Sequence, residues 1–106
     1  MHSFEITVQN FSSLYETDKD LLIIDVRELW EVEKVSLKGA THLPLATIAE
    51  HQPSLSVSAP IYVLCHYGVR SLKVALFLRE QGHEAYSIKG GIDAWAREID
   101  ASIGFY

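Results

Sequence analysis

The sequence predicts an α/β protein in which helices cover both faces of a parallel β-sheet. Short apolar runs, typical of strands, alternate along the chain with longer segments whose apolar residues recur at helical spacing. Residues 21–24 and 61–64 are apolar throughout, without the alternation of a half-exposed strand. Such runs are expected for strands buried on both faces, as the strands of a parallel sheet are.

The chain begins with a predicted strand and helix that lead into the first buried strand. Residues 4–8 alternate in polarity, which predicts a short strand. Thr7 or Asn10 is expected to cap the helix that follows, because both side chains can accept a backbone hydrogen bond. The buried strand at residues 21–24 then ends at Asp25.

The segment after Asp25 predicts a helix, a short strand and a further helix. Arg27 and Glu31 are interpreted as a solvated helix face with local ion pairs, and Trp30 as a packing residue. Residues 41–43 predict a short strand, and Pro44 suits the first turn of the next helix. A loop rich in serine and proline follows.

The second half of the chain repeats the pattern of strand followed by helix. Residues 61–64 predict the second buried strand, and residues 71–81 predict a largely buried helix with a glycine just past its end. Residues 84–88 predict the last strand. Gly90-Gly91 predicts a tight turn into the final helix, in which Trp95 is expected to belong to the core.

The chain's one cysteine, Cys65, lies where the second buried strand ends and a helix follows. Ligands of open α/β sheets bind at this edge, and helix N-termini favour negative charge. A thiol there is expected to ionise readily to the nucleophilic thiolate. Arg70 adds a permanent positive charge, and Gly68 lets loop amides converge. These residues predict a reactive sulfur among anion-binding donors, although an inert buried thiol is the alternative.

Four motifs along the chain occur together in one known family. They are Asp-Val-Arg-Glu at residues 25–28, Gly-Ala-Thr-His-Leu-Pro at 39–44, Cys-x-x-Gly-x-Arg-Ser at 65–71 and Gly-Gly-Ile-Asp-Ala-Trp at 90–95. Taken in this order, they resemble the rhodanese family of sulfurtransferases and cover most of the chain. Residues 32–38 depart from the family pattern.

The resemblance implies one rhodanese-like domain over residues 1–106, with about five strands in its sheet. It also implies that Cys65 takes the outer sulfur of a donor such as thiosulfate as a persulfide and passes it to cyanide, a thiol or a protein. Lys73 either adds positive potential at the site or is solvated. The expected substrate-binding residues are His66, Tyr67, Gly68, Val69, Arg70 and Ser71, and the expected supporting residues are Asp25, Arg27 and Lys89.

Asp25 has a structural interpretation that is preferred to a direct catalytic one. A carboxylate at the end of a buried strand can cap the next helix or pair with Arg27. In the rhodanese family, this acid supports the fold around the site and is not the nucleophile.

Two other classes of function remain open. A cysteine phosphatase or arsenate reductase also arranges a cysteine and an arginine around an oxyanion. Phosphatases place five residues between them, whereas four separate Cys65 from Arg70, and the smaller ring suits a single sulfur. The other class is a non-catalytic or relay module that binds a protein partner, as in rhodanese-like domains that have lost the cysteine.

Composition limits the partners and the location that are expected. A chain of 106 residues predicts one domain, and its net charge of −5 disfavours nucleic acid. No apolar run approaches the roughly 20 residues of a membrane span. One cysteine and scattered histidines predict neither a disulfide nor a metal site, and no cofactor is expected. Residues 1–5 lack signal-peptide features, so we expect a cytoplasmic protein whose partners are a small anionic sulfur donor and a sulfur-relay protein.

Overall fold

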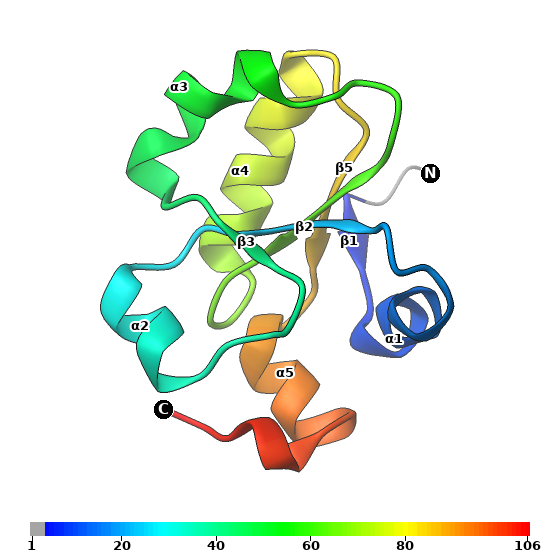
Figure 1. The fold of residues 1–106 in the computed structure, drawn as a ribbon, viewed down its shortest axis with the longest axis vertical. Helices are drawn as coiled ribbons and strands as arrows, with labels where there is room; N and C mark the ends of the chain where they lie inside the picture. Colours follow the sequence, from blue (N-terminus) through cyan, green and yellow to red (C-terminus); the bar gives the residue numbers. More distant parts are fainter. Residues whose placement is uncertain (1–3) are drawn as a thin grey trace.

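A parallel β-sheet organises the computed structural model, which describes residues 4–106 (Figure 1). Within these residues the sheet has five strands in the order β1-β5-β4-β2-β3, and neighbouring strands are parallel. The strands are β1 (Glu5–Ile6), β2 (Leu22–Asp25), β3 (Thr41–His42), β4 (Ile61–Leu64) and β5 (Ala85–Ile88). The predicted fold class is confirmed, whereas the signal-peptide expectation rests partly on residues 1–3, which lie outside the described residues.

Helices cover both faces of this sheet. They are α1 (Val8–Thr17), α2 (Leu29–Lys34), α3 (Ile48–His51), α4 (Val69–Glu80) and α5 (Gly91–Glu98), with short 3-10 turns at Leu45–Thr47, Gln52–Ser54 and Ala101–Ile103. In Figure 1, α3 and α4 lie above the sheet, and α1, α2 and α5 lie below it. Over residues 4–106, none of the helices is long and apolar enough to cross a membrane.

The sheet divides the buried core into clusters on its opposite faces. One cluster is aromatic, with Phe11 of α1 and Trp95 of α5 packed edge to face at 5.8 Å. The other joins Val63 of β4 and Leu78 of α4 to Cys65. The expectation that Trp95 belongs to the core is confirmed. Cys65 is itself a core residue on the α4 side, so the packing of that face holds it in place.

Helix α4 begins two residues earlier than the sequence predicts. The prediction placed its start at Ser71, but the structure places it at Val69. Gly68 precedes the helix with a left-handed φ of 95°, a conformation that glycine adopts without a steric penalty. Arg70 and Ser71 therefore lie in the first turn of the helix, and their backbone N–H groups point back toward the loop.

Other local predictions have mixed outcomes. Thr7 caps α1, since its Oγ1 accepts a hydrogen bond from the N–H of Asn10 at 3.2 Å. Pro44 was expected to open a helix, but it precedes a 3-10 turn that leads into the short helix α3. Trp30 was expected to pack, yet it is 58% exposed, and its ring lies nearly perpendicular to that of Tyr106 with centroids 6.1 Å apart.

The corner between β5 and α5 packs directly against the loop that follows β4. Gly91 has a φ of 65°, and a Cβ atom at this position would lie 2.4 Å from the carbonyl oxygen of His66 and 2.5 Å from that of Cys65. The first turn of α5 also binds these carbonyls. The N–H of Ile92 donates to Cys65 at 2.9 Å, and the N–H of Asp93 donates to His66 at 3.1 Å. The start of α5 thus fixes the backbone around the cysteine.

The close approach at Gly91 predicts a large cost for adding a methyl group there. Gly91→Ala combines left-handed backbone strain with a clash against two carbonyls, so it is expected to lower the free energy of unfolding by about 3 kcal/mol. Gly82→Ala is the matched control, because Gly82 has a φ of 95° and a Cβ atom added there would meet nothing within 4 Å. The control should lose about 1 kcal/mol. Urea unfolding measures both, and equal losses would contradict the close packing at Gly91.

Candidate active site

The sulfur of Cys65 lies inside a ring of hydrogen-bond donors. Its side chain is only 1% exposed. Sγ accepts hydrogen bonds from the backbone N–H of Gly68 at 3.1 Å and of Ser71 at 3.3 Å. The Cys65 thiol donates to the Ser71 hydroxyl at 3.2 Å, and that hydroxyl lies 2.6 Å from the hydroxyl of Ser87. This ring suits negative charge on sulfur, because donors aimed at a buried anion replace the water it has lost.

Glycines allow the loop to close this tightly around the sulfur. A Cβ atom at Gly68 would lie 2.9 Å from the backbone nitrogen of Gly90, so a larger residue would push the loop away from the β5–α5 corner. The hydroxyl of Ser87 lies 3.4 Å from the carbonyl oxygen of Gly68 and supports the loop from β5. The Gly-Gly pair of the final motif and the glycine of the cysteine motif thus form one packed unit.

Arg70 is held by a carboxylate that the sequence did not link to it. Its Nη1 and Nη2 donate to Oε1 and Oε2 of Glu31 at 2.6 and 2.8 Å. Glu31 was expected on a solvated face, and this is wrong, because its side chain is 5% exposed and lies under Arg70. The hydrogen bonds from Arg70 lower the pKa of Glu31 to about 2. Glu31 in turn raises the pKa of Arg70 above its ordinary value.

Asp25 and Arg27 form a buried ion pair next to the site. Nη2 of Arg27 donates to Oδ2 of Asp25 at 2.7 Å, and its Nε donates to Oδ1 at 2.9 Å. The predicted pairing is confirmed. The expectation of a solvated Arg27 is wrong, since its side chain is fully buried and its Nη2 also donates to the carbonyl of Val35. The pair ties the end of β2 to the segment after α2, and the supporting role predicted for both residues stays a prediction.

Tyr106 joins these ion pairs to the cysteine loop, and the sequence did not indicate this. Nη1 of Arg27 donates to the Tyr106 hydroxyl at 2.9 Å, and that hydroxyl donates to Oε2 of Glu31 at 2.8 Å. The Tyr106 ring stacks on the ring of His66, with centroids 3.9 Å apart, and His66 stacks on Tyr67 at 3.8 Å. Burial raises the pKa of Tyr106 to about 12. Residues 103–106 are largely apolar, and this pattern does not by itself predict these contacts.

The remaining predicted residues differ in their exposure. Tyr67 and Val69 are 60% and 64% exposed, so their side chains form the outer rim of the loop. The imidazole Nε2 of His66 is buried without a hydrogen-bond partner. Lys89 is exposed and lines a surface pocket whose lining also includes Glu98. The roles predicted for these residues in substrate binding and support stay predictions.

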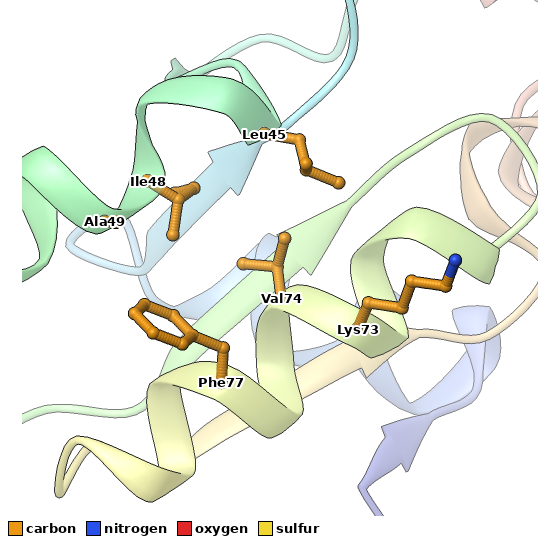
Figure 2. A pocket seen from close by; sticks show the side chains of 6 residues that line it. All are labelled: Leu45, Ile48, Ala49, Lys73, Val74 and Phe77. Atoms are coloured by element: carbon orange, nitrogen blue, oxygen red, sulfur yellow. The ribbon is translucent and has the colours of Figure 1, made fainter.

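An apolar pocket lies on the sheet face that α3 and α4 cover (Figure 2). Figure 2 shows that the ammonium group of Lys73 points away from Phe77 at the edge of this pocket. Cys65 does not belong to its lining, so the pocket is separate from the ring around the sulfur. The lining residues are Leu45, Ile48, Ala49, Lys73, Val74 and Phe77.

Known proteins resemble this chain over most of its length. The family described as Rhodanese-like domain matches residues 7–98. "Thiosulfate sulfurtransferase GlpE" of Actinobacillus succinogenes is 33% identical over 94 residues, which are 88% of this chain and 84% of that protein. "Putative sulfurtransferase YtwF" of Bacillus subtilis is 33% identical over 94 residues, covering 89% of this chain and 91% of YtwF. "Putative sulfur carrier protein YrkF" of the same organism is 33% identical over 97 residues, but the match spans only 52% of its length.

Solved structures of rhodanese-like proteins share the fold. A rhodanese-like domain protein from Staphylococcus aureus superposes with a TM-score of 0.83 at 28% identity, covering 96% of this chain and 97% of that one. A rhodanese-related protein from Thermoplasma volcanium has a TM-score of 0.79 at 28% identity, with coverage of 90% and 92%. The α/β fold with its five-stranded sheet, as described over residues 4–106, is thus that of rhodanese-like domains.

The Glu31–Arg70 pair predicts a specific loss of stability in acid. Glu31 has a pKa of about 2 in the folded protein against an ordinary value of 4.5. The contribution of ionised Glu31 to the free energy of unfolding is therefore complete above pH 4.5 and is lost as the pH falls toward 2. Between about pH 6 and pH 3, the wild type should lose roughly 2 kcal/mol of unfolding free energy more than Glu31→Gln.

Urea unfolding at each pH measures this difference. Glu84→Gln is the control, because Glu84 is exposed and accepts a hydrogen bond from the Tyr86 hydroxyl, outside the cysteine loop. This variant should keep the pH dependence of the wild type. If the unfolding free energies of the wild type and Glu31→Gln depend on pH in the same way, Glu31 is not the group that causes the loss of stability in acid.

Proposed function

This chain belongs to the family of rhodanese-like domains, and from that membership we propose that it is a sulfurtransferase that carries the transferred sulfur on Cys65. The observation that carries the proposal is the ring around Sγ, in which the N–H groups of Gly68 and Ser71 both point at the sulfur. A buried sulfur with such donors is suited to hold negative charge through a covalent cycle.

In the first half-reaction, the Cys65 thiolate attacks the outer sulfur of a donor such as thiosulfate. A bond forms between the cysteine sulfur and the outer sulfur. The bond between the two sulfurs of the donor breaks, and sulfite leaves with its electron pair. The persulfide that remains on Cys65 carries the negative charge on its terminal sulfur. The other backbone N–H groups of the loop, between Cys65 and Ser71, stabilise that charge.

In the second half-reaction, a thiophilic acceptor such as cyanide, a thiol or a protein thiol attacks the terminal sulfur of the persulfide. The bond to the cysteine sulfur breaks, and Cys65 returns to the thiolate. Because the donor product leaves before the acceptor reacts, ping-pong kinetics are expected. Gly68 and Ser71 hold the cysteine sulfur in both halves of the cycle, so the site needs no rearrangement between them.

The names of the relatives suggest two kinds of exchange partner for this site. GlpE is named for thiosulfate, and YrkF is named as a sulfur carrier protein. We therefore propose a small sulfane-sulfur donor together with a protein that receives or delivers sulfur in a relay. The one cysteine of the chain suits a reducing compartment, so we also propose a cytoplasmic location.

Intact mass spectrometry tests the persulfide directly. After incubation with thiosulfate, the wild type is expected to gain the mass of one sulfur atom, and cyanide should remove it. Cys65→Ser is expected to gain nothing under the same conditions, because it lacks the nucleophile. If a polysulfide but not thiosulfate adds sulfur to Cys65, the proposed persulfide cycle stands and the proposed sulfur donor is wrong.

Absence of any adduct from every sulfane donor, in a protein whose Cys65 reacts with iodoacetamide, would contradict the sulfurtransferase proposal. The reaction with iodoacetamide is the control, because it shows that the thiol is reduced and accessible. A domain with such a result would fit a non-catalytic binding module.

A further inference from the structure

The charge of Arg70 is already matched before any substrate arrives. Its guanidinium donates to both oxygens of Glu31, so a bidentate ion pair takes up two of its five N–H donors and balances its charge. Arg27 is matched in the same way by Asp25. An anion that needs Arg70 must therefore compete with a buried carboxylate that is already well bound.

Tyr106 makes that competition harder. Its hydroxyl donates to Oε2 of Glu31, while the N–H of Glu28 donates to Oε1 at 3.0 Å. Each carboxylate oxygen of Glu31 thus accepts one hydrogen bond in addition to that from Arg70. The stacked ring of His66 and the hydrogen bond from Arg27 hold Tyr106 in place. Glu31 is consequently fixed where it keeps Arg70 engaged.

Tyr106 is a feature of this chain beyond the segment that defines the family. The family match ends at residue 98, so Tyr106 lies eight positions past it. The turn at Ala101–Ile103 brings the following residues back toward α2 (Figure 1). The contacts of Tyr106 with Glu31 and His66 therefore add a constraint that the family motifs do not contain.

The sulfur donors that the site could use differ in charge. Thiosulfate is a dianion, so its approach to the Cys65 thiolate brings three negative charges together. An organic persulfide, R–S–SH, brings no further charge when it is protonated. Because the charge of Arg70 is matched by Glu31, it offsets little of the repulsion that thiosulfate meets. The backbone N–H groups of Gly68 and Ser71 stabilise the sulfur equally well with either sulfur donor.

We propose that Glu31 and Tyr106 are positioning residues that set donor specificity, directing the site toward organic persulfides and away from dianionic donors such as thiosulfate. This inference rests on the proposed sulfurtransferase function. The Cys65 thiolate bonds to the outer sulfur of R–S–SH, and the S–S bond of the donor breaks. RS⁻ leaves with the electron pair of that bond, and the proton stays on the transferred sulfur. No external oxidant or reductant takes part.

The test compares thiosulfate with the persulfide of 2-mercaptoethanol, whose organic part is uncharged. The kcat and KM of sulfur transfer to cyanide are measured for each donor. Glu31→Gln keeps the shape of the side chain but frees Arg70, so the KM for thiosulfate is expected to fall about fivefold while that for the persulfide changes little. Tyr106→Phe keeps the stacked ring and loses the hydroxyl. Its KM for thiosulfate is expected to fall about twofold.

Matched controls separate this effect from a general structural one. Tyr86→Phe and Glu84→Gln each disrupt the hydrogen bond between the Tyr86 hydroxyl and Glu84, which lies outside the cysteine loop. Both controls should keep the wild-type preference between the donors. Thermal unfolding verifies that each variant is folded, and Tyr106→Phe remains a test if Glu31→Gln is not.

The outcomes distinguish the inference from the function on which it rests. A rise in the ratio of kcat/KM for thiosulfate to that for the persulfide, in the site variants and not in the controls, supports the inference. An unchanged ratio, or a parallel loss with both donors, overturns it while the wild type still transfers sulfur. If the wild type takes sulfur from neither donor, the proposed function fails as well.

Discussion

The structure around Cys65 depends on the contact between the cysteine loop and the start of α5. The carbonyls of Cys65 and His66 accept hydrogen bonds from the first turn of that helix, and Gly91 approaches them too closely for any side chain. Because these carbonyls are bound on the α5 side, the N–H groups of Gly68 and Ser71 are free to converge on the sulfur. The donor ring is therefore built by the backbone, and a distant glycine is one of its structural requirements.

The arginines beside this ring act first as structural cations. Arg27 and Arg70 each bind a buried carboxylate, and the hydroxyl of Tyr106 links the two pairs. Removing one member would leave its partner charged and buried, which is costly. The charges of both arginines are thus balanced by carboxylates, and the groups that donate hydrogen bonds to the sulfur itself are the neutral backbone amides of Gly68 and Ser71. Such a site is suited to a reaction in which the net charge at the sulfur changes little.

The sequence predicted the features that depend on neighbouring residues, and it failed where partners are distant in the chain. The buried strands, the position of Cys65 and the pairing of Asp25 with Arg27 follow from local patterns, and the structure confirms them. The contact of Glu31 with Arg70 spans 39 positions, and its local surroundings resemble an exposed helix face. The position of Tyr106 depends on how a whole segment folds back, which no periodicity encodes.

The central claim is that the loop holds the transferred sulfur, and a crystal structure of the sulfur-loaded protein tests it most directly. After treatment with a sulfane donor, additional electron density is expected on Sγ of Cys65. The terminal sulfur should lie inside the loop, within about 3.5 Å of backbone N–H groups between Cys65 and Ser71. A terminal sulfur that points into solvent without these contacts, or a sulfur bound elsewhere, would contradict the claim.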